Sequence, residues 1–221
     1  MATAKKTQRI AIFIIMIVMV VGTLGSFFVI ILENDNQKDQ AKRQQAAMAD
    51  YQKSMDDYQE KLDAQASELS KKYYPTFSQY KDLPAKFELE GVDKLVKKDL
   101  KIGSGKQIED DTKFAAYYIG WTPDGKIFDQ SIENEALKPP LDIRDGLANA
   151  SLIDGWKQGM KGMKIGGVRL LEIPSDLAYG ETGQGEDIPP NTPLKFVVMA
   201  IELPKQIEQP EIPDELSRGL Y

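Results

Sequence analysis

The 221-residue chain contains neither cysteine nor histidine, and each absence excludes a class of chemistry. Without cysteine there is no disulfide, no thiolate nucleophile, no Cys-ligated zinc or iron–sulfur site and no lipid-modified cysteine. Without histidine there is no Ser-His-Asp triad, no imidazole proton shuttle and no His metal site. Carboxylates, lysines, tyrosines, hydroxyl groups or the shape of a binding site must therefore carry the protein's chemistry.

The charge has the wrong sign for a nucleic-acid-binding protein. The chain has a formal net charge of −6 and a pI of about 4.9, and its lysines are interspersed with Asp and Glu. Nucleic-acid binders instead carry a basic patch or stripe, so we expect no nucleic-acid partner. With 42% hydrophobic residues, the length suits one or two domains with an ordinary core.

An uncharged apolar run begins at Ile10 and ends at Leu32, and it predicts a transmembrane helix over residues 10–32. At about 1.5 Å per residue the run spans roughly 34 Å, enough for a hydrocarbon core of about 30 Å. A cleaved signal peptide is the alternative, but its apolar region is about 7–15 residues long and ends at a small-residue site. Basic residues precede the run and acidic residues follow it. The positive-inside rule therefore predicts a cell-membrane protein with residues 1–9 in the cytoplasm and the remainder outside it.

Residues 33–73 contain no proline or glycine and are rich in helix formers, so they predict a long helical stalk that Pro75 ends. One narrow apolar stripe recurs along it at intervals of four and three residues: Tyr51, Met55, Tyr58, Leu62, Ala66, Leu69 and Tyr73. Two interpretations remain open at this point. The stalk is either a solvated spacer or a homodimer interface along the stripe.

After a linker at residues 74–91, the hydrophobic period changes from 3.6 to 2, which predicts strands. The strand candidates are residues 95–102, 113–121, 126–131, 168–174 and 194–203. Ser151, followed three residues later by Asp154, predicts the start of one short helix, and Gly159 and Gly162 offer its end. The pattern predicts an α+β fold, an antiparallel sheet with one helix, followed by a flexible acidic tail at residues 205–221.

Two glycine motifs lack the residues that a phosphate site requires. Before Gly103-Ser104-Gly105-Lys106, a phosphate loop needs glycine where Leu100 stands, and after it a Ser or Thr where Gln107 stands. Gly180, Gly183 and Gly185 lead into two consecutive prolines rather than a helix N-terminus. Neither motif therefore predicts a nucleotide site.

Five motifs in order resemble the FKBP-type peptidyl-prolyl cis–trans isomerases, and the resemblance covers residues 92–204. They are Tyr117-Tyr118-Ile119-Gly120, Asp124-Gly125-Lys126-Ile127-Phe128-Asp129-Gln130-Ser131, Leu152-Ile153-Asp154-Gly155-Trp156-Lys157-Gln158-Gly159-Met160, Ala178-Tyr179-Gly180 and Ile188-Pro189-Pro190-Asn191-Thr192-Pro193-Leu194-Lys195-Phe196. The resemblance implies an antiparallel half-barrel sheet wrapped on one short helix, with an aromatic pocket between them.

Carried over by position, the resemblance implies catalytic roles for Tyr118, Asp129 and Tyr179. It implies a substrate-binding set with Trp156 as the pocket floor, made up of Phe128, Leu141, Leu152, Ile153, Trp156, Ile188 and Phe196. It calls for no metal and no cofactor. Three positions depart from the common family pattern: Leu141 replaces an aromatic residue, Gln184 a histidine and Asp187 an apolar flap residue. Arg144 is the nearest arginine expected to pair with Asp129.

The implied activity is peptidyl-prolyl cis–trans isomerisation in exported or membrane-proximal proteins. The expected ligands are proline-containing polypeptides and a macrolide. A proline-peptide-binding chaperone module with little turnover is the alternative function.

Overall fold

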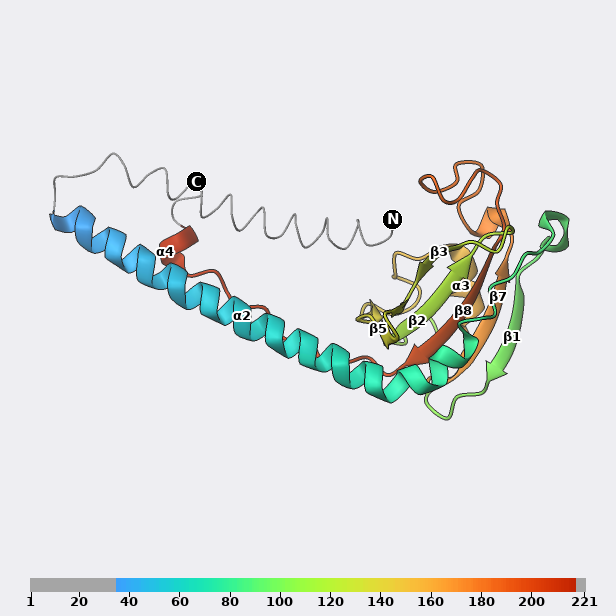
Figure 1. Cartoon of the computed structure of the whole chain (residues 1–221), viewed down its shortest axis with the longest axis horizontal. Helices are drawn as coiled ribbons and strands as arrows, with labels where there is room; N and C mark the ends of the chain where they lie inside the picture. Colours follow the sequence, from blue (N-terminus) through green and yellow to red (C-terminus); the bar gives the residue numbers. More distant parts are fainter. Residues whose placement is uncertain (1–34, 218–221) are drawn as a thin grey trace. The chain divides into compact units, whose positions relative to one another are not determined.

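The structure is a computed structural model that describes residues 35–217 (Figure 1). Its elements are α2 (Asp35–Phe77), η1 (Ser78–Tyr80), η2 (Leu89–Gly91), β1 (Val96–Lys101), β2 (Phe114–Trp121), β3 (Ile127–Gln130), β4 (Ile132–Glu133), β5 (Ala136–Leu137), β6 (Leu141–Ile143), α3 (Asp154–Met160), β7 (Val168–Ile173), η3 (Ser175–Leu177), β8 (Leu194–Ile201) and α4 (Asp214–Ser217). The described residues divide into two compact units. One comprises residues 61–206, and the other comprises residues 35–60 and 207–217.

The sheet lies in the unit 61–206 and has the strand order β1-β7-β8-β2-β3, with β6 also paired to β2. All of these pairings are antiparallel. Phe114–Ala116 of β2 face β6, whereas Ile119–Trp121 face β3. Because β3 and β6 pair with opposite ends of β2, they lie far apart along that strand. The predicted antiparallel sheet with one helix is confirmed.

Successive side chains of β8 point to opposite faces of the sheet, and both faces are buried. Phe196 and Val198 point into a core cluster that also contains Trp156 of α3. Val197 and Met199 point into a second cluster on the opposite face. Since successive strand residues face opposite sides, a strand buried on both sides reads as a continuous apolar run, as β8 does after Lys195.

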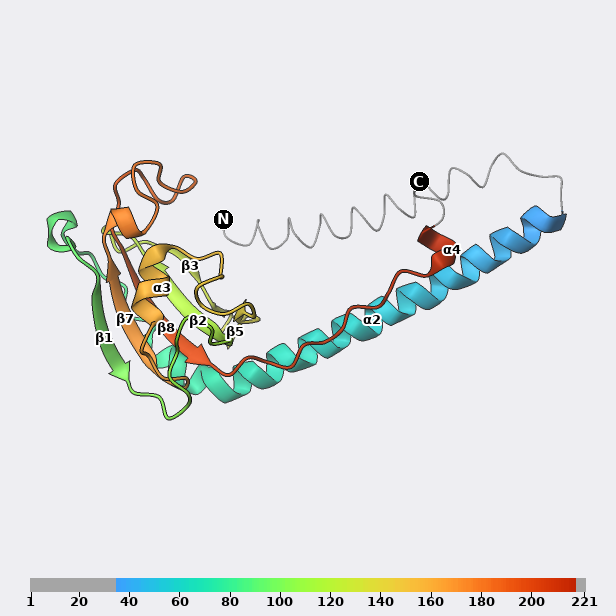
Figure 2. The ribbon, with the colours of Figure 1, turned by 180° about the vertical axis from the view of Figure 1, so that it is seen from behind.

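The short helix α3 covers one face of the sheet, and Figure 2 shows the molecule from the side of this helix. Two glycines let it approach β7. A Cβ on Gly155 would lie 2.2 Å from Ile173 Cγ2, and one on Gly159 would lie 2.8 Å from Leu171 Cδ1. The buried Arg169 of β7 donates hydrogen bonds to the carbonyls of Gly159 (2.7 Å) and Lys161 (3.3 Å) and so satisfies the last turn of α3.

The predicted capping residue of this helix is wrong. The N-cap is Ile153, in an extended conformation, and no side chain caps the helix. Ser151 lies two residues before that position, and Asp154 is the first helical residue. The first turn is closed by the backbone instead, because the Trp156 N–H donates to the Ile153 carbonyl at 3.0 Å.

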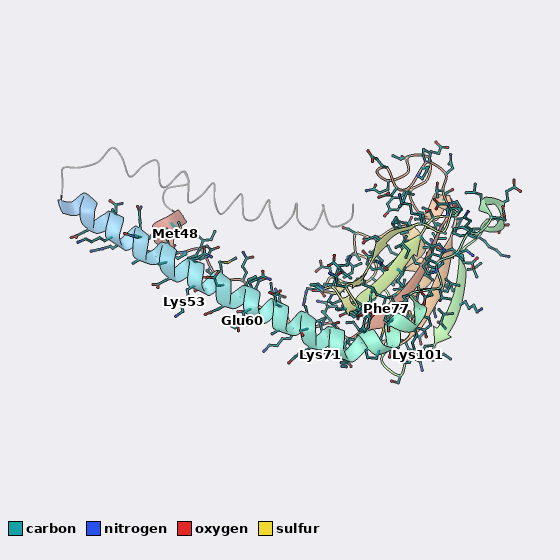
Figure 3. All side chains as sticks on the ribbon, in the orientation of Figure 1. Met48, Lys53, Glu60, Lys71, Phe77 and Lys101 are labelled. Carbon is teal, nitrogen blue, oxygen red and sulfur yellow. The ribbon has the colours of Figure 1, made fainter. Side chains whose placement is uncertain are left out.

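The predicted end of the long helix is also wrong, because α2 continues through Pro75 to Phe77. A proline inside a helix removes one backbone hydrogen bond at a cost of about 3 kcal/mol, so burial elsewhere must offset it. Phe77 is 0% exposed and packs with Tyr117 at a ring-centroid distance of 6.2 Å. Figure 3 labels Phe77 at the end of α2, beside the strands. The last turns of α2 therefore belong to the core of the unit 61–206.

Within residues 35–217, no helix combines the length and apolar character needed to cross a membrane. The predicted span at residues 10–32 lies outside the described residues.

Candidate functional site

Four aromatic side chains from four elements meet between α3 and the sheet. Tyr118 and Phe196 each pack edge-on against Trp156, with ring centroids 5.4 and 5.5 Å away. Phe128 packs edge-on against Phe196 at 5.5 Å. Trp156 and Phe196 are each only 4% exposed, whereas Tyr118 and Phe128 are half-buried. The cluster therefore has a buried base at Trp156 and partly open sides, an arrangement suited to holding a small apolar ring.

Gly120 makes room for this cluster. It lies on β2 opposite Phe196 of β8. A Cβ at Gly120 would come within 2.6 Å of both Phe128 Cζ and Phe196 Cε1. Such contacts are shorter than side chains tolerate, so any other residue here would displace one ring or both. The sequence motif that contains Gly120 does not predict this role. The signal for it is a single glycine among the apolar residues of β2.

A short hydrogen bond links Tyr118 to Asp129. The Tyr118 hydroxyl donates to Asp129 Oδ2 at 2.5 Å, and the Gln130 N–H donates to Asp129 Oδ1 at 2.8 Å. The nearest cation is Lys138, whose Nζ lies 3.8 Å from Asp129 Oδ1. Burial, and then this hydrogen bond to a carboxylate, raise the pKa of Tyr118 above its ordinary value. The Tyr118 hydroxyl therefore stays protonated and its ring is held in one orientation.

The expectation that Arg144 pairs with Asp129 is wrong, because Arg144 donates to Asp142 Oδ2 at 2.6 and 3.0 Å. The register explains why. Ile143 is paired with Phe114 at the start of β2, whereas Asp129 is paired with Gly120 near its end. Six residues of a strand span about 20 Å, which is too far for an arginine side chain to bridge.

Two hydrogen-bond donors beside the cluster have no acceptor among the described residues. They are the Tyr179 hydroxyl and the Ile153 N–H. Both residues pack against the cluster that contains Trp156. Burial, and then the negative charge of Asp129, raise the pKa of Tyr179, so its hydroxyl remains a donor at neutral pH.

Comparison with known proteins agrees with this geometry. The family model for FKBP-type peptidyl-prolyl cis-trans isomerases matches residues 104–201. An FK506-binding protein of Neisseria meningitidis serogroup A is 38% identical over 109 residues, which cover 49% of this chain and 95% of that protein. The chain belongs to the FKBP-type peptidyl-prolyl isomerase family.

Two further proteins are similar to this chain. The peptidyl-prolyl cis-trans isomerase Mip of Chlamydia trachomatis serovar D is 41% identical over 110 residues, which cover 49% of this chain but 41% of that protein. The crystal structure of a peptidyl-prolyl cis-trans isomerase from Pseudomonas syringae is 35% identical, covers 63% of this chain and 96% of that one, and has a TM-score of 0.43. The chain thus spans less than half of the Chlamydia relative, and the match concerns the isomerase domain.

Of the other predicted substrate-binding residues, two lie at the Trp156 cluster and one does not. Ile188 is 3% exposed and belongs to the Trp156 cluster, and Leu152 packs against that cluster while half-buried. Leu141 is 37% exposed and belongs to neither cluster, so the structure does not bring it to the aromatic residues.

The loop before Ile188 is tied to the turn between β2 and β3. Asp187 Oδ1 accepts a hydrogen bond from Lys126 Nζ at 2.7 Å, and both side chains are about half exposed. Gln184 forms a bridge with Ile188 through the backbone, at 2.8 and 3.2 Å. Asp187 therefore makes a polar contact at the position where the family pattern has an apolar flap residue.

Proposed function

We propose that this protein is a membrane-anchored isomerase that accelerates X-Pro rotation in exported or membrane-proximal polypeptides. The FKBP-type domain supports the reaction, and the apolar run at residues 10–32 supports the anchor. Basic residues before the run and acidic residues after it support a domain outside the cytoplasm. On this proposal the helix α2 begins close to the membrane surface.

The reaction requires loss of amide resonance, which sets a barrier of about 18–20 kcal/mol. The planar amide is more dipolar than the twisted one, so water stabilises the ground state more than the transition state. An apolar surface that excludes water from the amide removes this difference. The cluster of Tyr118, Phe128, Trp156 and Phe196 offers such a surface, with Trp156 as the base on which the prolyl ring rests.

The two unpaired donors complete the proposed mechanism. The Ile153 N–H and the Tyr179 hydroxyl bind carbonyls of the substrate and hold the chain on either side of the proline. A contact that strengthens as the amide twists lowers the barrier, whereas one of constant strength only tightens binding. Asp129 orients Tyr118 through the 2.5 Å hydrogen bond, so it acts on the substrate through the ring. No proton moves and no covalent bond forms, which is consistent with a chain lacking histidine and cysteine.

A second function, a proline-peptide-binding chaperone module with little turnover, is favoured by two observations. Leu141 lies away from the aromatic cluster, and Asp187 makes a polar contact at the rim. The same cluster is also the site we propose for a macrolide, since several relatives are FK506-binding proteins.

The observation that carries the proposal is the Trp156 cluster with two free donors beside it. Its test is the relaxation of a chromogenic X-Pro tetrapeptide with the chain in detergent micelles. We expect Asp129→Asn to lower kcat/KM about tenfold, because a hydrogen bond to a charged group contributes about 1.5–3 kcal/mol. Asp110→Asn is the matched control, since Asp110 is also an exposed, ion-paired acid, but it bonds Lys161. If the chain bound the peptide without accelerating its X-Pro rotation, the chaperone module would be the correct function rather than the isomerase.

The location is tested separately by adding protease to intact cells. We expect the isomerase domain to be digested while residues 1–9, carrying an epitope tag, are protected. A protected isomerase domain would overturn the proposed orientation.

A further inference from the structure

One face of α2 is partly covered along its length. In the stretch 39–60, the half-buried positions recur every three or four residues: Ala41, Gln44, Ala47, Met48, Tyr51, Met55 and Tyr58. The residues between them are exposed. A helix surrounded by water shows no such asymmetry in large side chains, so another segment must cover this face, which we name the tyrosine face.

The C-terminal segment has a burial period of three. Ile207, Pro210, Pro213 and Leu216 are half-buried, while the residues between them up to Glu215 are exposed. Ile212 is 55% exposed although it is as apolar as Ile207, so position rather than hydrophobicity decides which side chains are covered. Leu216 lies in α4, so before that helix the period rests on Ile207, Pro210 and Pro213. Three residues per turn is the period of the polyproline II helix. The sequence predicts a flexible tail here, and it gives no signal of what the segment packs against.

The tyrosine face and the C-terminal segment lie side by side. Residues 35–60 and 207–217 belong to one compact unit. Figures 1 and 2 both show the segment running along α2 in the opposite direction. The lengths agree: residues 41–58 of a helix extend about 26 Å. Residues 207–213 as polyproline II add about 19 Å to the roughly 5 Å of α4.

The same arrangement continues in the unit 61–206. Gln65 Nε2 donates a hydrogen bond to the Lys205 carbonyl at 2.8 Å. Leu203 packs against the same cluster as Leu69 and Tyr73 of α2. A polyproline II segment makes no internal hydrogen bonds, so its carbonyls are free to accept such donors.

We infer that the tyrosine face of α2 is a second peptide-binding site, specific for polyproline-type segments with an apolar residue at every third position, and that residues 207–217 occupy it. The site lies on another part of the chain from the Trp156 cluster and performs no chemistry. On this inference the stretch 41–58 is not a homodimer interface, because a face covered by the chain's own C-terminus cannot pair with a second copy.

The binding of the C-terminal segment as a separate peptide tests the inference. A fluorescent peptide copying residues 203–217 is titrated with the micelle-solubilised chain truncated after Gln206 and, separately, with the 221-residue chain. We expect the truncated chain to bind and the full chain to bind at least tenfold more weakly, because a tethered segment has an effective concentration near the millimolar range. Equal binding by both chains, or none by the truncated chain, would overturn the inference.

Register provides the matched control. A peptide carrying Ile207→Ser and Leu216→Ser should lose at least tenfold in affinity, whereas one carrying Ile212→Ser should bind as the unchanged peptide does. Equal losses would show that general hydrophobicity, and not the three-residue period, drives binding.

A second measurement keeps the full chain intact. Because the protein has no cysteine, Lys53→Cys and Glu211→Cys introduce two unique labelling sites at exposed positions of the helix and the segment. We expect a narrow spin-label distance distribution that broadens with Ile207→Ser and Leu216→Ser but not with Ile212→Ser. A distribution already broad in the doubly labelled parent would refute the packing. Sedimentation of the truncated chain as a dimer that binds no peptide would reassign the tyrosine face to helix pairing.

Discussion

Replacing Phe77 with alanine tests whether the end of α2 is part of the isomerase core. Phe77 is 0% exposed and packs against Tyr117, whose ring also lies 6.1 Å from Tyr73. A buried phenylalanine removes at least about 150 Å² from water, which at about 25 cal/mol per Å² is worth roughly 4 kcal/mol. Measured Phe→Ala changes in cores cost about 3–5 kcal/mol. We therefore expect Phe77→Ala to lower the free energy of unfolding by about 3–5 kcal/mol.

Urea denaturation followed by tryptophan fluorescence measures this loss, because Trp121 lies in the same cluster as Phe77 and Trp156 lies on the other face. Met55→Ala, a half-buried change on the same helix but in the other unit, should cost less than about 1 kcal/mol. Activity per folded molecule should stay within about twofold, since the Trp156 cluster is on the opposite face of the sheet. A Phe77→Ala variant as stable as Met55→Ala would refute the assignment of α2's last turns to the core.

Two further predictions concern the site itself. Gly120→Ala should lower kcat/KM at least about tenfold and change the near-ultraviolet circular dichroism, because its Cβ would lie 2.6 Å from two aromatic rings; an unchanged spectrum would show that the rings yield freely. The pKa of Tyr118 is raised from an ordinary value of 10.0. Stability that this tyrosine contributes is therefore intact below pH 10 and falls above it, because the unfolded chain releases its proton first. As the pH rises from 8 to 11, the free energy of unfolding measured in urea should fall less in Tyr118→Phe than in the parent. An equal fall would show that the raised pKa of Tyr118 does not cause the loss.

The strands and the aromatic cluster were predictable for different reasons. Of the eight strands within residues 35–217, five were predicted to within two residues, because the apolar pattern of a strand is a local property of the chain. The other three, β4, β5 and β6, were not predicted, because strands of two or three residues are too short to show a period. Trp156, Tyr118, Phe128 and Phe196 were assigned together from five ordered motifs, which local periodicity alone does not connect. The cation beside Asp129 was not predictable. Whether Lys138 or Arg144 reaches it depends on where β6 pairs along β2, and spacing in the sequence does not encode that register.

The apolar run of β8 predicts that both faces of the sheet are covered, but it does not identify the residues that cover the second face. From Phe196 to Ile201 every residue is apolar, which indicates that both faces of β8 are covered. One short helix covers only one face, so other residues have to cover the second face. These residues come from the end of the stalk and from the predicted linker. The aromatic ones that pack in or against the cluster of Tyr117 and Trp121 are Tyr73, Tyr74, Phe77, Tyr80 and Phe87. A fragment beginning at residue 92 would lack these residues and expose that cluster, whereas the compact unit 61–206 contains all of them.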